Sequence, residues 1–200
     1  MKRVAPSLAA LIGSRICHDL VSPIGAISNG LELLSLANNG TTTPELELVR
    51  ESCDHANARL KYFRIAFGLA QPGQEMPARE LAEILADLST GSRVTVEWSG
   101  PEVVSRGEAQ MAFLAAMCLE SAMPRGGKTT ITVSGDALTV SCAGPALRTR
   151  AGFWSALTDD SEGELSPAEV QFALLREVAN AQERRIEIAQ ETERLTLTLL

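Results

Sequence analysis

Three polar residues that lie close together in the sequence, His18, Asp19 and Ser22, are the candidates for chemistry. An unperturbed imidazole has a pKa of about 6.5, so at pH 7 most of it is neutral and nucleophilic, and it can accept and release a phosphoryl group. The carboxylate of Asp19 can hydrogen-bond the ring and select its tautomer. The hydroxyl of Ser22, one helical turn further on, can contact the transferring group or water. These three are therefore candidate catalytic residues, with His18 as the candidate phosphorylation site.

An amphipathic helix is predicted to hold these side chains. Apolar residues recur every three or four positions from Leu8 to Leu34, which predicts one continuous buried stripe on a helix that ends near Ala37. At about 100° per residue, His18 lies on roughly the opposite side from this stripe and is expected to face solvent or a partner. The stripe consists of Leu8, Ile12, Ile16, Leu20, Ile24, Ile27, Leu31 and Leu34.

A proline inside this helix, Pro23, follows the His18-Asp19 pair by about one turn. It removes the N–H that would bond the Asp19 carbonyl, at a cost of ~3 kcal/mol, and predicts a kink at that point. A functional kink beside an exposed histidine is one interpretation. A solvated histidine beside a tolerated bend is the other.

The order His18-Asp19-x-x-Ser22-Pro23 resembles the H-box of two-component histidine kinases. The longer run over residues 18–34 resembles one branch in particular, the ChpT-type histidine phosphotransferases of bacterial phosphorelays. The resemblance implies that Nε2 of His18 accepts a phosphoryl group from the phospho-aspartate of a hybrid kinase's receiver domain. It further implies transfer from His18 to the receiver domains of response regulators, one of them a cell-cycle transcription factor. The Mg²⁺ for transfer can belong to the receiver, so no cofactor is expected on this chain.

A second amphipathic helix is predicted from Pro44 to about Leu69, after a short turn. Two such helices form an antiparallel hairpin that cannot cover both of its apolar stripes, which predicts a homodimer with a four-helix bundle. In this hairpin His18 lies level with about Tyr62. Basic residues near this height are candidates for docking a receiver, and the alternative is that they are ordinary solvated cations. They are Arg15, Arg59, Lys61 and Arg64.

A linker by composition, residues 71–77, separates a helical-hairpin domain (1–71) from a second domain (78–200). The second domain's order of helix, strand, helix, hairpin, helix, hairpin resembles the ATP-binding domain of histidine kinases, with helices layered on a mixed sheet. The fold class is therefore α+β. The predicted elements are helices over 78–88, 108–123 and from a capping box at Ser166 to about Gln182, and strands over 94–98, 128–134, 137–142, 184–190 and 194–200.

Two motifs that hold the nucleotide in histidine kinases are incomplete in this second domain. Ser121 stands in place of a Mg²⁺-binding asparagine and Met117 in place of its mate, and a hydroxyl and a thioether do not replace hard oxygen ligands. In the later Asp-x-Gly-x-Gly phrase, Cys142 replaces the aspartate and Ala146 the second glycine. We therefore expect no ATP binding and no autokinase activity. A phosphate-loop interpretation of residues 126–129 fails for two reasons. The spacing of the glycines does not match that motif, and a strand is predicted to follow where the motif requires a helix.

The composition argues against two classes of partner. The net charge is −7, with a balance of +1 over residues 1–70 and −8 over residues 71–200, so neither half offers the basic face that nucleic acid requires. No apolar run approaches the roughly 20 residues of a membrane span, so we expect a cytoplasmic protein. The four cysteines form no C-x-x-C pair, and we expect their thiols to be reduced. Two other functions stay open: a non-catalytic dimeric adaptor that docks receivers, and an autophosphorylating histidine kinase.

Overall fold

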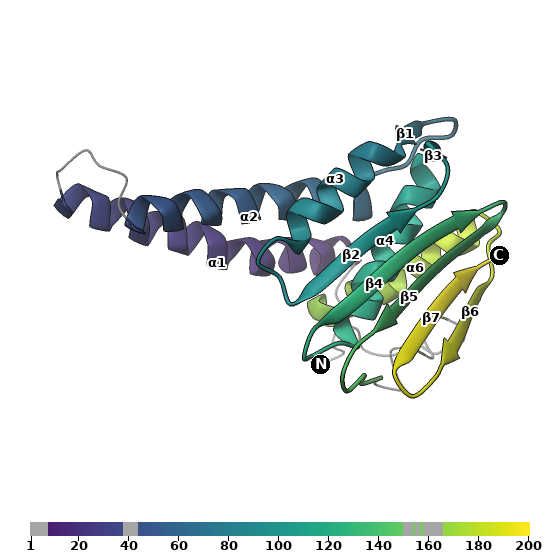
Figure 1. Ribbon diagram of the computed structural model, residues 1–200. Helices are drawn as coiled ribbons and strands as arrows, with labels where there is room; N and C mark the ends of the chain where they lie inside the picture. Colours follow the sequence, from purple (N-terminus) through teal and green to yellow (C-terminus); the bar gives the residue numbers. More distant parts are fainter. Residues whose placement is uncertain (1–7, 38–43, 150–153, 155–156, 158–165) are drawn as a thin grey trace, which may run out of the picture.

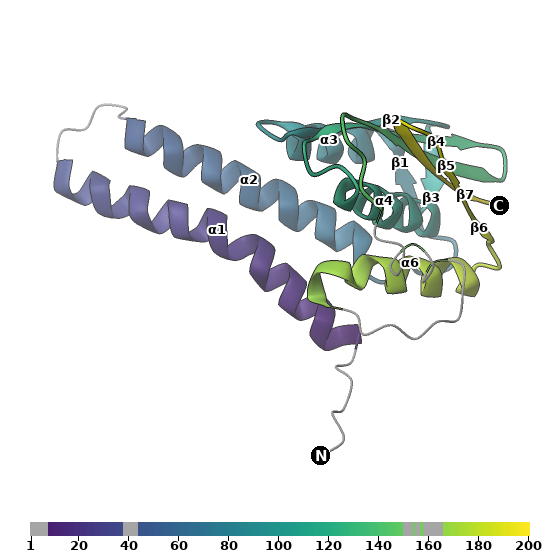
Figure 2. The ribbon, with the colours of Figure 1, turned by 90° about the horizontal axis from the view of Figure 1, so that it is seen from below.

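Two long helices extend from one side of a sheet-and-helix layer in the computed structural model, which describes residues 8–37, 44–149, 154, 157 and 166–200 (Figure 1). Helix α1 (Leu8–Ala37) and helix α2 (Pro44–Ala66) lie side by side and run in opposite directions (Figures 1 and 2). Helix α2 ends three residues before the predicted Leu69. The predicted turn between the helices lies outside the described residues.

Helix α1 bends near its middle, where Pro23 lies (Figure 2). A proline inside a helix removes one backbone hydrogen bond and clashes with the preceding turn, so a bend at this residue is the expected response. Ile24 and Leu31 of the predicted stripe are exposed in the single chain, which agrees with the expectation that one hairpin cannot cover both of its apolar stripes. Ile16, nearer the start of α1, packs against the core.

The sheet has five strands in the order β2-β4-β5-β7-β6. Only β2 and β4 are parallel, and the remaining neighbours are antiparallel. A glycine with φ +57°, Gly135, allows the tight turn between β4 and β5, because glycine adopts this left-handed conformation without steric cost. The predicted strands are confirmed to within three residues; they are β2 (Val94–Ser99), β4 (Gly127–Ser134), β5 (Ala137–Ala143), β6 (Ile186–Gln190) and β7 (Arg194–Leu199).

Helices α4 (Arg106–Ser121) and α6 (Val170–Ala181) cover one face of this sheet (Figure 2), and α3 (Ala78–Ser89) packs against both α2 and β2. The predicted capping box is present: the backbone N–H and the hydroxyl of Ser166 both donate to the Glu169 carboxylate, at 3.0 and 2.7 Å. These bonds begin a 3₁₀ turn, η1 (Pro167–Glu169), that leads into α6. No described helix is both long and apolar enough to cross a membrane.

Part of the predicted linker is a strand. Residues Glu75–Pro77 form β1, which pairs antiparallel with β3 (Val103–Ser105) in a second, two-stranded sheet. Three-residue strands carry too little periodicity to be recognised from sequence, and Pro77 argues against a strand unless the strand lies at an edge. A two-stranded sheet has only edges, so the proline is tolerated here.

The end of α2 belongs to the same apolar core as the sheet and α4. The Tyr62 ring stacks on the Phe113 ring at a centroid distance of 4.6 Å, and its hydroxyl donates to the Phe113 carbonyl at 2.6 Å. Burial, with a smaller contribution from the charge of Glu120, raises the pKa of the Tyr62 phenol well above its ordinary value. The segments 1–71 and 78–200 are therefore joined by packing as well as by the chain between them.

Two polar side chains of α4 complete this junction. Arg106 donates one nitrogen to the carbonyls of Arg64 and Ile65, at 2.8 Å each. Gln110 donates to the carbonyls of Ala66 and Gly68, at 3.2 and 2.9 Å. The last carbonyls of a helix have no partner within that helix, so these bonds satisfy groups that would otherwise be buried unpaired.

Candidate functional site

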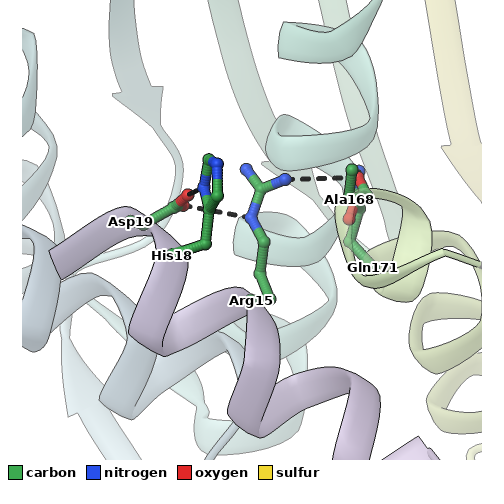
Figure 3. A network of polar contacts seen from close by, with 5 residues as sticks. All are labelled: Arg15, His18, Asp19, Ala168 and Gln171. Carbon is green, nitrogen blue, oxygen red and sulfur yellow. Dashed lines mark hydrogen bonds and ion pairs between the residues drawn. The ribbon is translucent and has the colours of Figure 1, made fainter. Parts of the chain in front are cut away.

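The His18 side chain stands on the surface of α1 and is 84% exposed, whereas the adjacent Asp19 side chain is only 9% exposed. The two are hydrogen-bonded, with His18 Nδ1 and Asp19 Oδ1 3.0 Å apart. The other carboxylate oxygen, Oδ2, accepts from Nε of Arg15, also at 3.0 Å. Figure 3 shows these contacts, with one Asp19 carboxylate bonded both to the His18 ring and to the Arg15 guanidinium.

The contact with Asp19 indicates which ring nitrogen of His18 carries a proton. An ionised carboxylate only accepts hydrogen bonds, so Nδ1 must carry the proton in this contact. The proton-free nitrogen is then Nε2, which has a lone pair for nucleophilic attack. The arrangement leaves the ring exposed and favours the tautomer in which Nε2 is free of a proton.

A cleft of about 380 Å³ opens beside Asp19, between the two long helices and the turn that follows α3. Ser22 and Asp19 line it from α1, and Arg59 lines it from α2. Glu120, near the end of α4, lines the same cleft. The structure therefore brings Asp19, Ser22 and one predicted docking cation to a single concave surface next to His18.

The four predicted docking cations have different surroundings. Arg59 lies over the ring of Phe63, with its guanidinium carbon 6.0 Å from the ring centroid, and it lines the cleft. Lys61 and Arg64 instead face α3. Their partners there are Asp87, at 3.3 Å from the Lys61 nitrogen, and Glu80, at 3.7 Å from the Arg64 nitrogen.

Arg15 points to the second half of the chain as well as to Asp19. Its Nη1 donates to the backbone carbonyl of Ala168 in η1, at 3.2 Å, across a separation of 153 residues (Figure 3). The buried side chain of Gln171 donates to the same carbonyl at 3.0 Å. Sequence reasoning missed Ala168 and Gln171, because an alanine carbonyl and a single glutamine carry no signal of such a contact.

His55, the second histidine, is exposed, and its Nε2 lies 3.2 Å from the Thr90 carbonyl. A carbonyl is only an acceptor, so this nitrogen carries a proton. His55 has no carboxylate partner among the contacts of the described residues. It therefore lacks the arrangement that characterises His18.

Met117 and Cys142, two of the positions predicted to have lost nucleotide ligands, are buried, whereas Ser121 is exposed. Met117 is buried in α4, and the hydroxyl of Ser121 donates to the Cys118 carbonyl at 2.6 Å. Burial raises the pKa of the Cys142 thiol to about 11, so this side chain stays protonated at neutral pH. The buried thioether of Met117 does not offer the oxygen donors that Mg²⁺ prefers, and at Cys142 a protonated thiol stands in place of the aspartate of the later motif.

Comparison with known proteins shows the family to which the chain belongs. A family model described as the C-terminal domain of histidine phosphotransferases matches residues 78–194, more than half of the chain. The chain therefore belongs to the family of ChpT-type histidine phosphotransferases.

A particular relative is the protein phosphotransferase ChpT of Brucella abortus (strain 2308), to which the chain is 33% identical over 133 residues. The alignment covers 66% of this chain and 63% of the Brucella protein, so it spans less than two thirds of that relative. A solved structure of a bacterial phosphotransferase is 26% identical, with a TM-score of 0.81 over 100% of this chain and 98% of that one.

Proposed function

We propose that this protein is a phosphorelay histidine phosphotransferase that carries the phosphoryl group on Nε2 of His18. The lone pair of Nε2 attacks the phosphorus of a receiver's phospho-aspartate. An N–P bond forms as the P–O bond to the aspartyl group breaks, and the receiver's carboxylate leaves. The aspartate of a second receiver then attacks the phosphorus and regenerates the neutral imidazole. The observation that carries the proposal is the exposed ring whose Nδ1 is held by Asp19.

Asp19 supports both steps of this exchange. As Nε2 forms its bond to phosphorus, positive charge develops on the imidazole, and the adjacent carboxylate stabilises that charge. Ser22 lines the cleft, which supports a contact of its hydroxyl with the transferring group or a water molecule. Phosphoryl transfer needs in-line positioning and charge neutralisation more than covalent assistance, so the receiver's own Mg²⁺ suffices.

The donor in this proposal is the receiver domain of a hybrid histidine kinase, and the acceptors are response regulators. Arg59 supports docking of such domains, because it lines the cleft beside Asp19 and its guanidinium has no carboxylate partner among the ion pairs of the described residues. Lys61 and Arg64 are engaged with α3. Their ion pairs are exposed and contribute little stability, so a receiver can replace those partners.

The decisive experiment compares two sources of phosphate. The purified protein is incubated with labelled ATP alone, and separately with receiver domains of hybrid kinases charged with labelled acetyl phosphate. We expect label on the protein only with a charged receiver. Label that enters from ATP without a receiver would identify a kinase. A receiver that binds the protein but never transfers its phosphate would identify an adaptor.

A homodimer is part of the proposal. Exposed apolar residues lie one heptad apart on α1, at Ile24 and Leu31, and two heptads apart on α2, at Leu46 and Leu60. This spacing is typical of helices that pack against further helices, and a second copy of the hairpin would cover the four side chains in a four-helix bundle.

We expect light scattering to give about twice the chain mass of 21.4 kDa for the native protein. The variant Leu31→Lys should shift the protein toward monomer, because it places a charge in the bundle interior. The control is Leu69→Lys, since Leu69 is 91% exposed and lies outside both helices. A native protein that is monomeric at micromolar concentration contradicts the proposed bundle.

A further inference from the structure

We propose that Arg15 is a positioning residue that holds the Asp19 carboxylate and thereby keeps His18 in the tautomer with a free Nε2. This role differs from the docking role that the sequence predicts for the same residue. Its consequence for phosphoryl transfer rests on the proposed function, whereas its effect on the imidazole ring does not.

The geometry restricts the carboxylate from two sides. Asp19 Oδ1 faces the His18 ring and Oδ2 faces Nε of Arg15, each at 3.0 Å, so both oxygens have a partner. Arg15 and Asp19 are four residues apart on α1 and therefore lie on the same face of the helix. Hydrogen bonds between charged groups are shorter and stronger than neutral ones, so Arg15 selects one rotamer of the Asp19 side chain.

The guanidinium of Arg15 is itself anchored. Its Nη1 donates to the Ala168 carbonyl, and the side chain is only 21% exposed. The turn that carries Ala168 is fixed by the capping bonds between Ser166 and Glu169 and by the contact from Gln171. Arg15 thus joins the exposed histidine to η1, at the start of the segment that leads into α6 (Figure 3).

The consequence concerns the chemistry of the imidazole. A neutral imidazole exchanges its proton between Nδ1 and Nε2, and in water the histidine side chain favours the proton on Nε2. That tautomer has no lone pair on the nitrogen that faces a receiver, so it cannot attack phosphorus there. A carboxylate held next to Nδ1 favours the reactive tautomer, and a freely rotating carboxylate does so less.

The test uses Arg15→Gln, the conservative variant Arg15→Lys, and Arg50→Gln as a matched control. Arg50 forms ion pairs with Glu47 and Asp54 within α2, so its replacement also removes intrahelical ion pairs, and it does so away from His18. The tautomer of His18 is read from ¹⁵N NMR spectra of the ring, at a pH where the ring is neutral. Transfer from a receiver charged with labelled acetyl phosphate is measured over a range of receiver concentrations.

We expect Arg15→Gln to move the ring toward the Nε2–H tautomer and to lower the maximal transfer rate by about fivefold, with an unchanged half-saturating receiver concentration. Arg15→Lys should lie between this variant and the native protein, and Arg50→Gln should match the native protein. If Arg15→Gln leaves the tautomer unchanged and only raises the half-saturating concentration, Arg15 is a docking cation and the inference is wrong. If the tautomer shifts but the native protein accepts no phosphoryl group, the positioning role stands and the proposed function fails.

Discussion

We expect the His18→Gln variant to fold normally, to bind receiver domains and to accept no phosphoryl group. Glutamine approximates the length and hydrogen-bonding capacity of histidine, but its amide nitrogen has no nucleophilic lone pair. Because the His18 side chain is almost fully exposed, the substitution should change the free energy of unfolding by no more than about 0.5 kcal/mol. The rate of transfer from a charged receiver should fall by a factor on the order of 10³ or more, as for the loss of other catalytic nucleophiles.

Two further variants make this result specific. The His55→Gln protein should still become labelled at residue 18, because His55 lacks the carboxylate partner that orients His18. Arg59→Gln should raise the receiver concentration needed for half-maximal transfer and leave the maximal rate nearly unchanged, since Arg59 acts on docking in our proposal. Label that persists in His18→Gln and disappears only when His55 is also replaced would move the phosphorylation site to His55.

The largest expected loss of stability comes from Tyr62→Ala. This change removes a ring that stacks on Phe113 in the shared core, together with a buried hydrogen bond to the Phe113 carbonyl. Removal of a buried aromatic side chain costs about 3–5 kcal/mol, through the lost burial and the cavity that remains. The free energy of unfolding is measured by urea titration at fixed protein concentration, with circular dichroism for the helices and tryptophan fluorescence for Trp98 and Trp154.

The control for this prediction is Tyr62→Phe, which keeps the ring and should cost about 0.5–1.5 kcal/mol for the lost hydrogen bond. Since α2 enters the common core, both signals should report one transition in the native protein and in both variants. Helical signal that survives after the tryptophan signal has been lost would instead indicate two independent domains joined by a linker.

Several elements are determined by short stretches of the sequence. The apolar period of three to four residues identified α1, the predicted strands over 128–134 and 137–142 identified the β4–β5 hairpin, and the Ser166–Glu169 capping box identified the start of the segment that leads into α6. The adjacency of His18 and Asp19 also predicted the hydrogen bond that selects the tautomer. Each of these features depends on residues within about one helical turn or one hairpin, so the local pattern suffices.

Other features exist only in the tertiary structure. Arg15, with no distinguishing neighbour in sequence, contacts a carbonyl 153 residues away, and the cations Lys61 and Arg64 are engaged by carboxylates of α3. The burial of the end of α2 within the core of the second half is likewise absent from any local pattern. The sequence alone predicted which residues could react, and it located the helix on which they lie. The contacts that these side chains make with distant segments were decided by tertiary packing. Such contacts depend on how whole elements pack against each other, and the periodicity of a single element does not encode them.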